Sequence, residues 1–166
     1  MYNMSYKLTK QQKEEQSIKY TADMLLNFLE ANNKKQIIFS SSLKQEYMSN
    51  TYYKLLKNFP KDKKIRFMTS QRNIEKLIDD SNKQVIKQSF DLNELNTLLS
   101  NQDEFDYTVI VIPPINLFKE GIKLVKEVGA IILFEKYGIS TYENFEEELA
   151  LIKENDIEHY AVVPIK

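Results

Sequence analysis

Few side chains in this sequence could carry out chemistry. The chain contains no cysteine and one histidine, His159, which excludes thiolate chemistry and a histidine-rich metal site within one chain. Other candidate groups directly follow the apolar runs that predict strands, because ligands of open α/β sheets bind at the carboxyl ends of strands. These groups are Ser40–Ser42, Thr69-Ser70, Pro113-Pro114 and Glu135-Lys136. They contain no nucleophile beside a base and no pair of carboxylates, so they predict neither an enzyme nor a metal site.

The elements that must position these groups follow a regular order. Short apolar runs alternate with amphipathic stretches, which is typical of βαβ units and a parallel sheet. The runs predict strands at residues 36–39, 65–68, 84–86 (at an edge), 107–112, 130–134 and 160–163. The stretches predict helices at residues 14–31, 49–58, 73–80, from Asp91 onward, 116–128 and 142–154. We therefore expect an α/β fold, a three-layer α/β/α sandwich with a mostly parallel, Rossmann-like sheet.

Length and composition indicate an ordinary globular protein. With 166 residues, 42% apolar and 28% charged, the chain is expected to form a single domain, residues 1–166. Residues 1–13 are polar and expected to be flexible, and residues 14–31 form the first helix. No run approaches the roughly 18 apolar residues of a membrane span, and the N-terminus has no signal-peptide core. We expect a cytoplasmic protein.

Charge is divided unevenly along the chain. Residues 1–90 contain 17 Lys/Arg and 9 Asp/Glu, whereas residues 91–166 contain 6 Lys and 15 Asp/Glu. The division indicates a basic face for an anionic partner, head-to-tail self-association, or simply two solvated faces of different charge. The basic run, which is the candidate partner-binding or membrane-facing patch, contains Lys54, Lys57, Lys61, Lys63, Lys64 and Arg66. It lacks interleaved aromatic residues and base-reading motifs, which argues against nucleic acid.

An ordered set of motifs in the second half of the chain indicates a family. Phe105-Asp106-Tyr107 precedes the most apolar strand, which ends at Pro113-Pro114, and the strand at 129–134 leads to Tyr137-Gly138 and Ser140-Thr141. This set resembles the phrases "FDYIIIDTPP" and "DGVLLVVRYGKT" of the bacterial tyrosine kinases (BY-kinases) of capsule and exopolysaccharide synthesis. That family belongs with the MinD/ParA group of deviant P-loop ATPases. The resemblance covers most of residues 14–164 and implies the P-loop NTPase version of the fold.

The phosphate loop of that family departs most from this sequence. It reads Ser-Ser-x-x-Gly-x-Gly-Lys-Ser/Thr, and its glycines let backbone N–H groups surround phosphate oxygens while its lysine neutralises charge. Laid without a gap onto Ser42, the glycine positions fall on Gln45 and Tyr47 and the lysine position on Met48. The magnesium-ligating hydroxyl falls on Ser49 and is the one that survives.

The metal-binding acids of the family are missing as well. Its Asp-x-Asp-x-Arg motif falls on Met68, Ser70 and Arg72, and the aspartate two residues before Pro113 is Val111. Magnesium-dependent phosphoryl transfer needs oxygen ligands and a charge clamp. The departures from the family's motifs therefore predict a protein with no nucleotide, metal or other cofactor and no enzymatic activity.

The resulting hypothesis is a catalytically inactive BY-kinase or MinD/ParA-like adaptor or regulator. The resemblance implies a membrane-anchored polysaccharide co-polymerase or related assembly protein as partner, contact with the inner face of the membrane through that partner, and assembly into homo-oligomers. Two alternatives remain open: a ParA-like pseudo-ATPase that positions a secretion or pilus machine, and a small-molecule-binding Rossmann-like domain.

Overall fold

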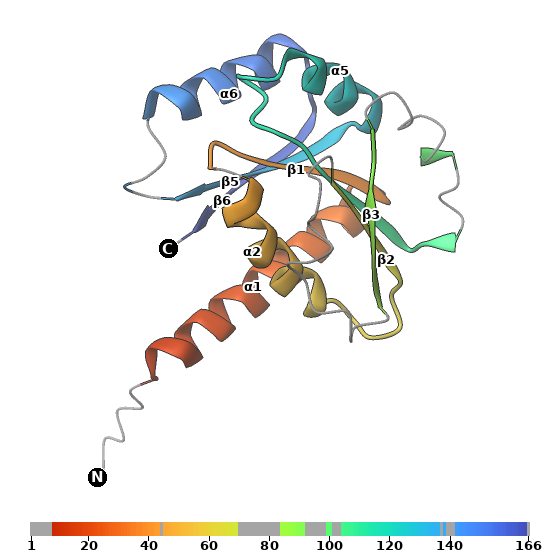
Figure 1. Cartoon of the computed structure of the whole chain (residues 1–166), viewed down its shortest axis with the longest axis vertical. Helices are drawn as coiled ribbons and strands as arrows, with labels where there is room; N and C mark the ends of the chain where they lie inside the picture. The colour runs from red at the N-terminus through yellow and green to blue at the C-terminus, as the bar shows by residue number, and fades with distance from the viewer. Residues whose placement is uncertain are drawn as a thin grey trace.

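Six parallel strands form the centre of the molecule (Figure 1). The computed structural model describes residues 8–43, 45–69, 84–91, 99–100, 104–136, 138 and 142–165. The strands are β1 (Gln36–Ser41), β2 (Ile65–Thr69), β3 (Val85–Ser89), β4 (Tyr107–Val111), β5 (Ala130–Lys136) and β6 (His159–Ile165). Their order across the sheet is β3-β2-β4-β1-β5-β6, and every neighbouring pair is parallel. All six predicted strands are confirmed.

The strands at the centre of the sheet, β4, β1 and β5, are buried on both faces. Ile38 of β1 lies opposite Ile110 of β4 and Ile131 of β5. All three side chains are fully buried. Strands in the interior of a parallel sheet read as continuous apolar runs, because helices cover both faces. The predicted weak strand, β3, lies at one edge, and β6 at the other edge alternates between half-buried and exposed residues.

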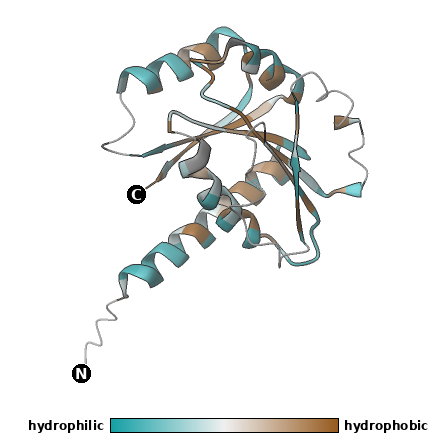
Figure 2. Ribbon diagram, in the orientation of Figure 1, coloured by the Kyte–Doolittle hydropathy of each residue, from teal (hydrophilic) through white to brown (hydrophobic). Residues whose placement is uncertain are grey.

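Helices cover the two faces of the sheet and complete three layers. On one face, α1 (Lys10–Ala31) and α2 (Gln45–Lys57) pack over a core that includes Leu29 and Leu56. On the other face, α5 (Lys119–Val128) and α6 (Tyr142–Glu154) pack over a second core that includes Val125 and Ile152. Figure 2 shows the apolar residues concentrated in the sheet and on the inner sides of the helices. The predicted α/β/α sandwich is confirmed, while the helices predicted at 73–80 and from Asp91 lie outside the described residues.

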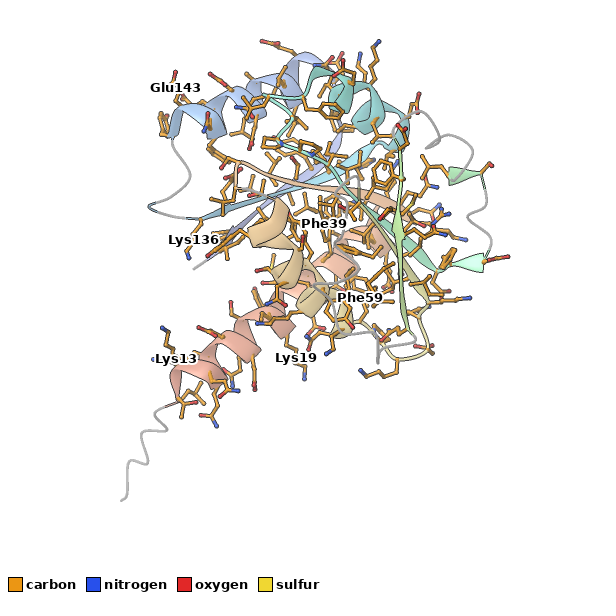
Figure 3. The ribbon with its side chains drawn as sticks, in the orientation of Figure 1. Lys13, Lys19, Phe39, Phe59, Lys136 and Glu143 are labelled. Atoms are coloured by element: carbon orange, nitrogen blue, oxygen red, sulfur yellow. The ribbon has the colours of Figure 1, made fainter. Side chains whose placement is uncertain are left out.

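The first helix begins earlier than predicted. The Thr9 side chain accepts a hydrogen bond from the Gln12 backbone, and the Gln12 side chain accepts one from the Thr9 backbone. This capping box satisfies N–H groups that a helix end leaves unpaired, so α1 starts at Lys10 and residues 10–13 are helical. The N-terminal half of α1 extends away from the sheet, and Lys13 and Lys19 on it are exposed (Figure 3).

Three aromatic rings fix α2 against the sheet. Phe39 of β1, Tyr52 of α2 and Phe134 of β5 lie with ring centroids 4.9–5.1 Å apart. Figure 3 shows Phe39 between the sheet and α2. Tilted and edge-to-face pairs at this separation add to the free energy of burial.

None of the described helices is both long and apolar enough to cross a membrane.

Candidate functional site

The turn between β1 and α2 lies at the carboxyl end of a central strand, where ligands of such sheets bind. β1 ends at Ser41 and α2 begins at Gln45, so three residues connect them. The helix was predicted to begin at residue 49 and begins four residues earlier. No glycine or proline interrupts the segment from Ser42 to Gln45, so nothing in the backbone delays the helix. The positions expected to form a phosphate loop are thus in the first turns of α2.

Residues at successive positions of α2 point in different directions. The side chain of Met48, at the position of the family's lysine, is 0% exposed and belongs to the core beneath α1 and α2. Ser49, at the hydroxyl position, is also fully buried. Tyr47 is 52% exposed, and its hydroxyl accepts a hydrogen bond of 2.7 Å from Lys136 Nζ. These three residues therefore share no common pocket at the turn.

The positions of the lost acids are also in the core. Met68 at the end of β2 and Val111 at the end of β4 are fully buried, on opposite faces of the sheet. Ser70 and Arg72, the other positions of the second motif, lie outside the described residues. A side chain at either described position packs between sheet and helices and does not line the carboxyl edge.

Glu135 makes the polar contacts at the β1–α2 turn. It is the second-last residue of β5, only 8% exposed, and its Oε1 accepts a 3.2 Å hydrogen bond from the Ser42 backbone N–H. The Ser42 hydroxyl donates to Oε2 of the same carboxylate. This internal anion thus takes both donor groups of Ser42, the first residue after β1.

A second carboxyl group lies against the first. Glu148 of α6 is 0% exposed, and no N–H or O–H group donates a hydrogen bond to either of its buried oxygens. Burial raises the pKa of Glu148 to about 9, assisted by the hydrogen bond that its protonated form makes to Glu135 and by the charge of Glu135. The two residues form a pair of carboxyl groups at the carboxyl edge, which the strand-end residues alone did not predict because Glu148 comes from α6.

The sequence contained a signal for this pair that the apolar pattern concealed. In the helix at 142–154, the spacing of Phe145, Leu149 and Ile152 marks one apolar face, which predicts that this face packs on the core. Glu148 lies three residues after Phe145 and four before Ile152, on the same side of a helix. A charged residue within an inward-facing stripe is unusual, because carboxylates are almost never fully buried unless they are paired.

The basic run forms only part of a surface. Lys54, Lys57, Lys61 and Lys64 are exposed, and Lys63 is half-buried beside a groove of about 390 Å³ that acidic residues also line. Arg66 differs, because it lies in β2, is 2% exposed and donates from Nε to Thr108 Oγ1 at 3.2 Å. Its guanidinium also stacks on the Phe105 ring, 5.0 Å from the centroid. Arg66 is therefore part of the sheet interior and not of the candidate partner surface, which we define as Lys54, Lys57, Lys61 and Lys64.

The parallel sheet with helices on both faces defines a three-layer α/β domain. Three solved structures are similar to it. The BceF tyrosine kinase domain gives a TM-score of 0.68 at 10% identity, covering 92% of this chain and 78% of that one. The chimerical protein CapA2B2 gives a TM-score of 0.62 at 12% identity, and the match covers 86% of this chain and 81% of that one. The kinase domain of the Escherichia coli tyrosine kinase ETK gives a TM-score of 0.61 at 13% identity, and the match covers 86% of this chain and 72% of that one.

The fold of this chain is thus that of bacterial tyrosine kinase domains, as the sequence motifs predicted. No protein-family model matches the sequence, and a search of curated proteins found no match. At 10–13% identity, the likeness extends to the arrangement of the sheet and helices and not to individual side chains.

Proposed function

We propose that this chain is a catalytically inactive relative of the BY-kinase domains and acts as an adaptor or regulator. The observation that carries the proposal is the placement of Met48. The residue that falls at the position of the phosphate-binding lysine is uncharged, fully buried and committed to the core. A cation at the β/γ-phosphates and backbone N–H groups around them are the essential parts of a phosphate loop.

The contacts of Glu135 support the same proposal. A nucleotide phosphate would need the free N–H groups at the start of α2, because a helix N-terminus is where such anions bind. In the turn that leads into α2, the Ser42 N–H and hydroxyl both donate to the Glu135 carboxylate, which lies close to that helix end. An anion brought to this turn would meet a carboxylate of the same sign, and the repulsion would oppose its binding.

The proposed partner follows from the resemblance. BY-kinases of capsule and exopolysaccharide synthesis work with membrane-anchored polysaccharide co-polymerases, and we propose such a protein, or a related assembly protein, as the partner. The protein would act at the inner face of the membrane through that contact. The candidate partner surface, Lys54, Lys57, Lys61 and Lys64, lies on the exposed side of α2 and on the segment after it.

Three measurements test the proposal. Titration calorimetry with Mg-ATP and Mg-ADP, followed by a phosphorylation assay on tyrosine-containing peptides, is expected to give neither binding nor transfer. Affinity purification of the tagged protein from its own cells is expected to recover a polysaccharide co-polymerase. Micromolar Mg-ATP binding would overturn the inactive assignment. Recovery of a secretion or pilus machine instead would favour the positioning alternative, and a small metabolite that raises Tm would favour the Rossmann-like receptor.

A further inference from the structure

The pair Glu135–Glu148 poses an electrostatic problem that the adaptor function does not address. Both carboxyl groups are nearly or fully inaccessible to solvent, and Glu148 receives no hydrogen bond from any donor. Ionised carboxylates in a protein interior are costly unless they are paired with a cation, hydrogen-bonded or bound to a metal. Two buried acids in contact, with no other group donating to Glu148, therefore need a positive species between them, either one shared proton or a bound cation.

Among the described residues, no lysine or arginine forms an ion pair with Glu148. Lys136, the next residue after Glu135 in β5, directs its Nζ to the hydroxyl of Tyr47. The same Nζ atom lies 5.3 Å from the centroid of the Tyr47 ring. A residue adjacent to Glu135 in a strand faces the opposite side of the sheet, so Lys136 does not reach the carboxyl pair.

The groups that surround this position are oxygen donors. The carboxylates of Glu135 and Glu148 come from β5 and α6, and the Ser42 hydroxyl comes from the β1–α2 turn. No three acidic, histidine or cysteine residues come together in the described part of the chain. Two carboxylates and a hydroxyl would therefore leave several coordination positions to water. Mg²⁺ is usually bound in this way, and Mn²⁺ and Ca²⁺ also select oxygen ligands.

We propose that Ser42, Glu135 and Glu148 bind one hard divalent cation, of the class of Mg²⁺, Mn²⁺ or Ca²⁺. The site is distinct from the positions at which the nucleotide-bound magnesium of a kinase would be expected, because Met68 and Val111 lie on other strands. The placement of Met48, which carries the inactive assignment, does not depend on whether a cation binds here. The cation would join three parts of the fold, namely β5, α6 and the β1–α2 turn. Ser42 is half-buried, so the cation would enter from the side of the turn.

Thermal unfolding of the metal-stripped full chain at constant ionic strength tests the site, with Mn²⁺ as the probe. A site with two carboxylates is expected to have a dissociation constant of about 0.1–1 mM. At about 10 mM Mn²⁺, binding to the folded state alone would then raise Tm by about 3–10 °C. Electron paramagnetic resonance of Mn²⁺ should show loss of free ion with one ion bound per chain.

Two variants locate the ion. Glu148→Gln keeps the shape of the side chain but removes a ligand charge, and it should abolish both the Tm shift and the resonance change. Glu143→Gln removes an exposed acid of the same helix and should leave both unchanged. Glu135→Gln serves as a second ligand variant if Glu148→Gln does not fold. The proposal is overturned if Mn²⁺ produces neither effect in the wild type, or if the ligand variants keep the response. If the wild type does not respond to Mn²⁺, Glu135 and Glu148 share a proton. If the ligand variants still respond, the ion binds to acidic residues on the surface.

Discussion

Replacing Met48 by lysine tests how the β1–α2 segment is folded. The substitution restores the residue that the family carries at this position of the phosphate loop. If Met48 lay at a phosphate site, the new ammonium group would be solvated and Met48→Lys would be tolerated. In the structure the side chain at 48 is 0% exposed and packs in the core beneath α1 and α2. We expect Met48→Lys to destabilise the protein strongly and not to create Mg-ATP binding.

The magnitude follows from the cost of keeping the new lysine uncharged. A buried lysine with no partner titrates with a pKa lowered to about 5–6, against about 10.4 in the unfolded chain. At pH 7 the lysine is neutral in the folded protein and charged in the unfolded chain, whose pKa lies about 3.4 units above this pH. At about 1.36 kcal/mol per unit, the free energy of unfolding falls by about 4–5 kcal/mol. A domain of this size is stable by roughly 5–15 kcal/mol in total. The cost shrinks by about 1.4 kcal/mol for each unit by which pH rises from 7 towards 10, because a lowered pKa in the folded state favours folding at high pH.

Urea unfolding at pH 7, 8 and 9 measures both quantities. Asn50→Lys on the exposed side of the same helix is the matched control and should change stability by less than about 0.5 kcal/mol with no such slope. Met48→Leu keeps an apolar side chain of similar volume and should cost less than about 1.5 kcal/mol. If Met48→Lys unfolds at the same urea concentration as Asn50→Lys at all three pH values, residue 48 is not in the core. The described placement of the turn would then be wrong.

Three further outcomes are expected. Calorimetric titration of the wild type with Mg-ATP should show no heat of binding, and a micromolar dissociation constant would contradict the inactive assignment. Ile110→Asp should prevent folding, as judged by circular dichroism, because an unpaired charge in the central strand costs several kcal/mol, whereas Ile110→Val should cost about 0.5–1.5 kcal/mol. Reversal of Lys57, Lys61 and Lys64 to glutamate should weaken association measured by light scattering and partner pull-down, and so should high salt. If neither change affects any interaction, these lysines form only a solvated face.

The sequence determined the elements of the fold. Short β-branched runs such as 107–112 and the spacing of apolar residues in 142–154 are local patterns, and each specifies a strand or helix by its own periodicity. Their alternation specified a parallel sheet, because parallel strands need crossover helices between them. The pairing of β1 with β4 belongs to the P-loop NTPase version of the fold, which the family resemblance implied. Periodicity carries no information on which strands pair.

The tertiary structure decided where individual polar residues lie. Arg66 stands in a basic run of the sequence, but a strand covered on both faces buries alternate residues on either side, and β2 is buried along its whole length. Glu135 and Glu148 are 13 residues apart and belong to different elements. Only the packing of α6 onto the end of β5 brings them together. Burial and long-range contact depend on how elements are assembled, so a pattern read along one element identifies neither the buried arginine nor the carboxyl pair.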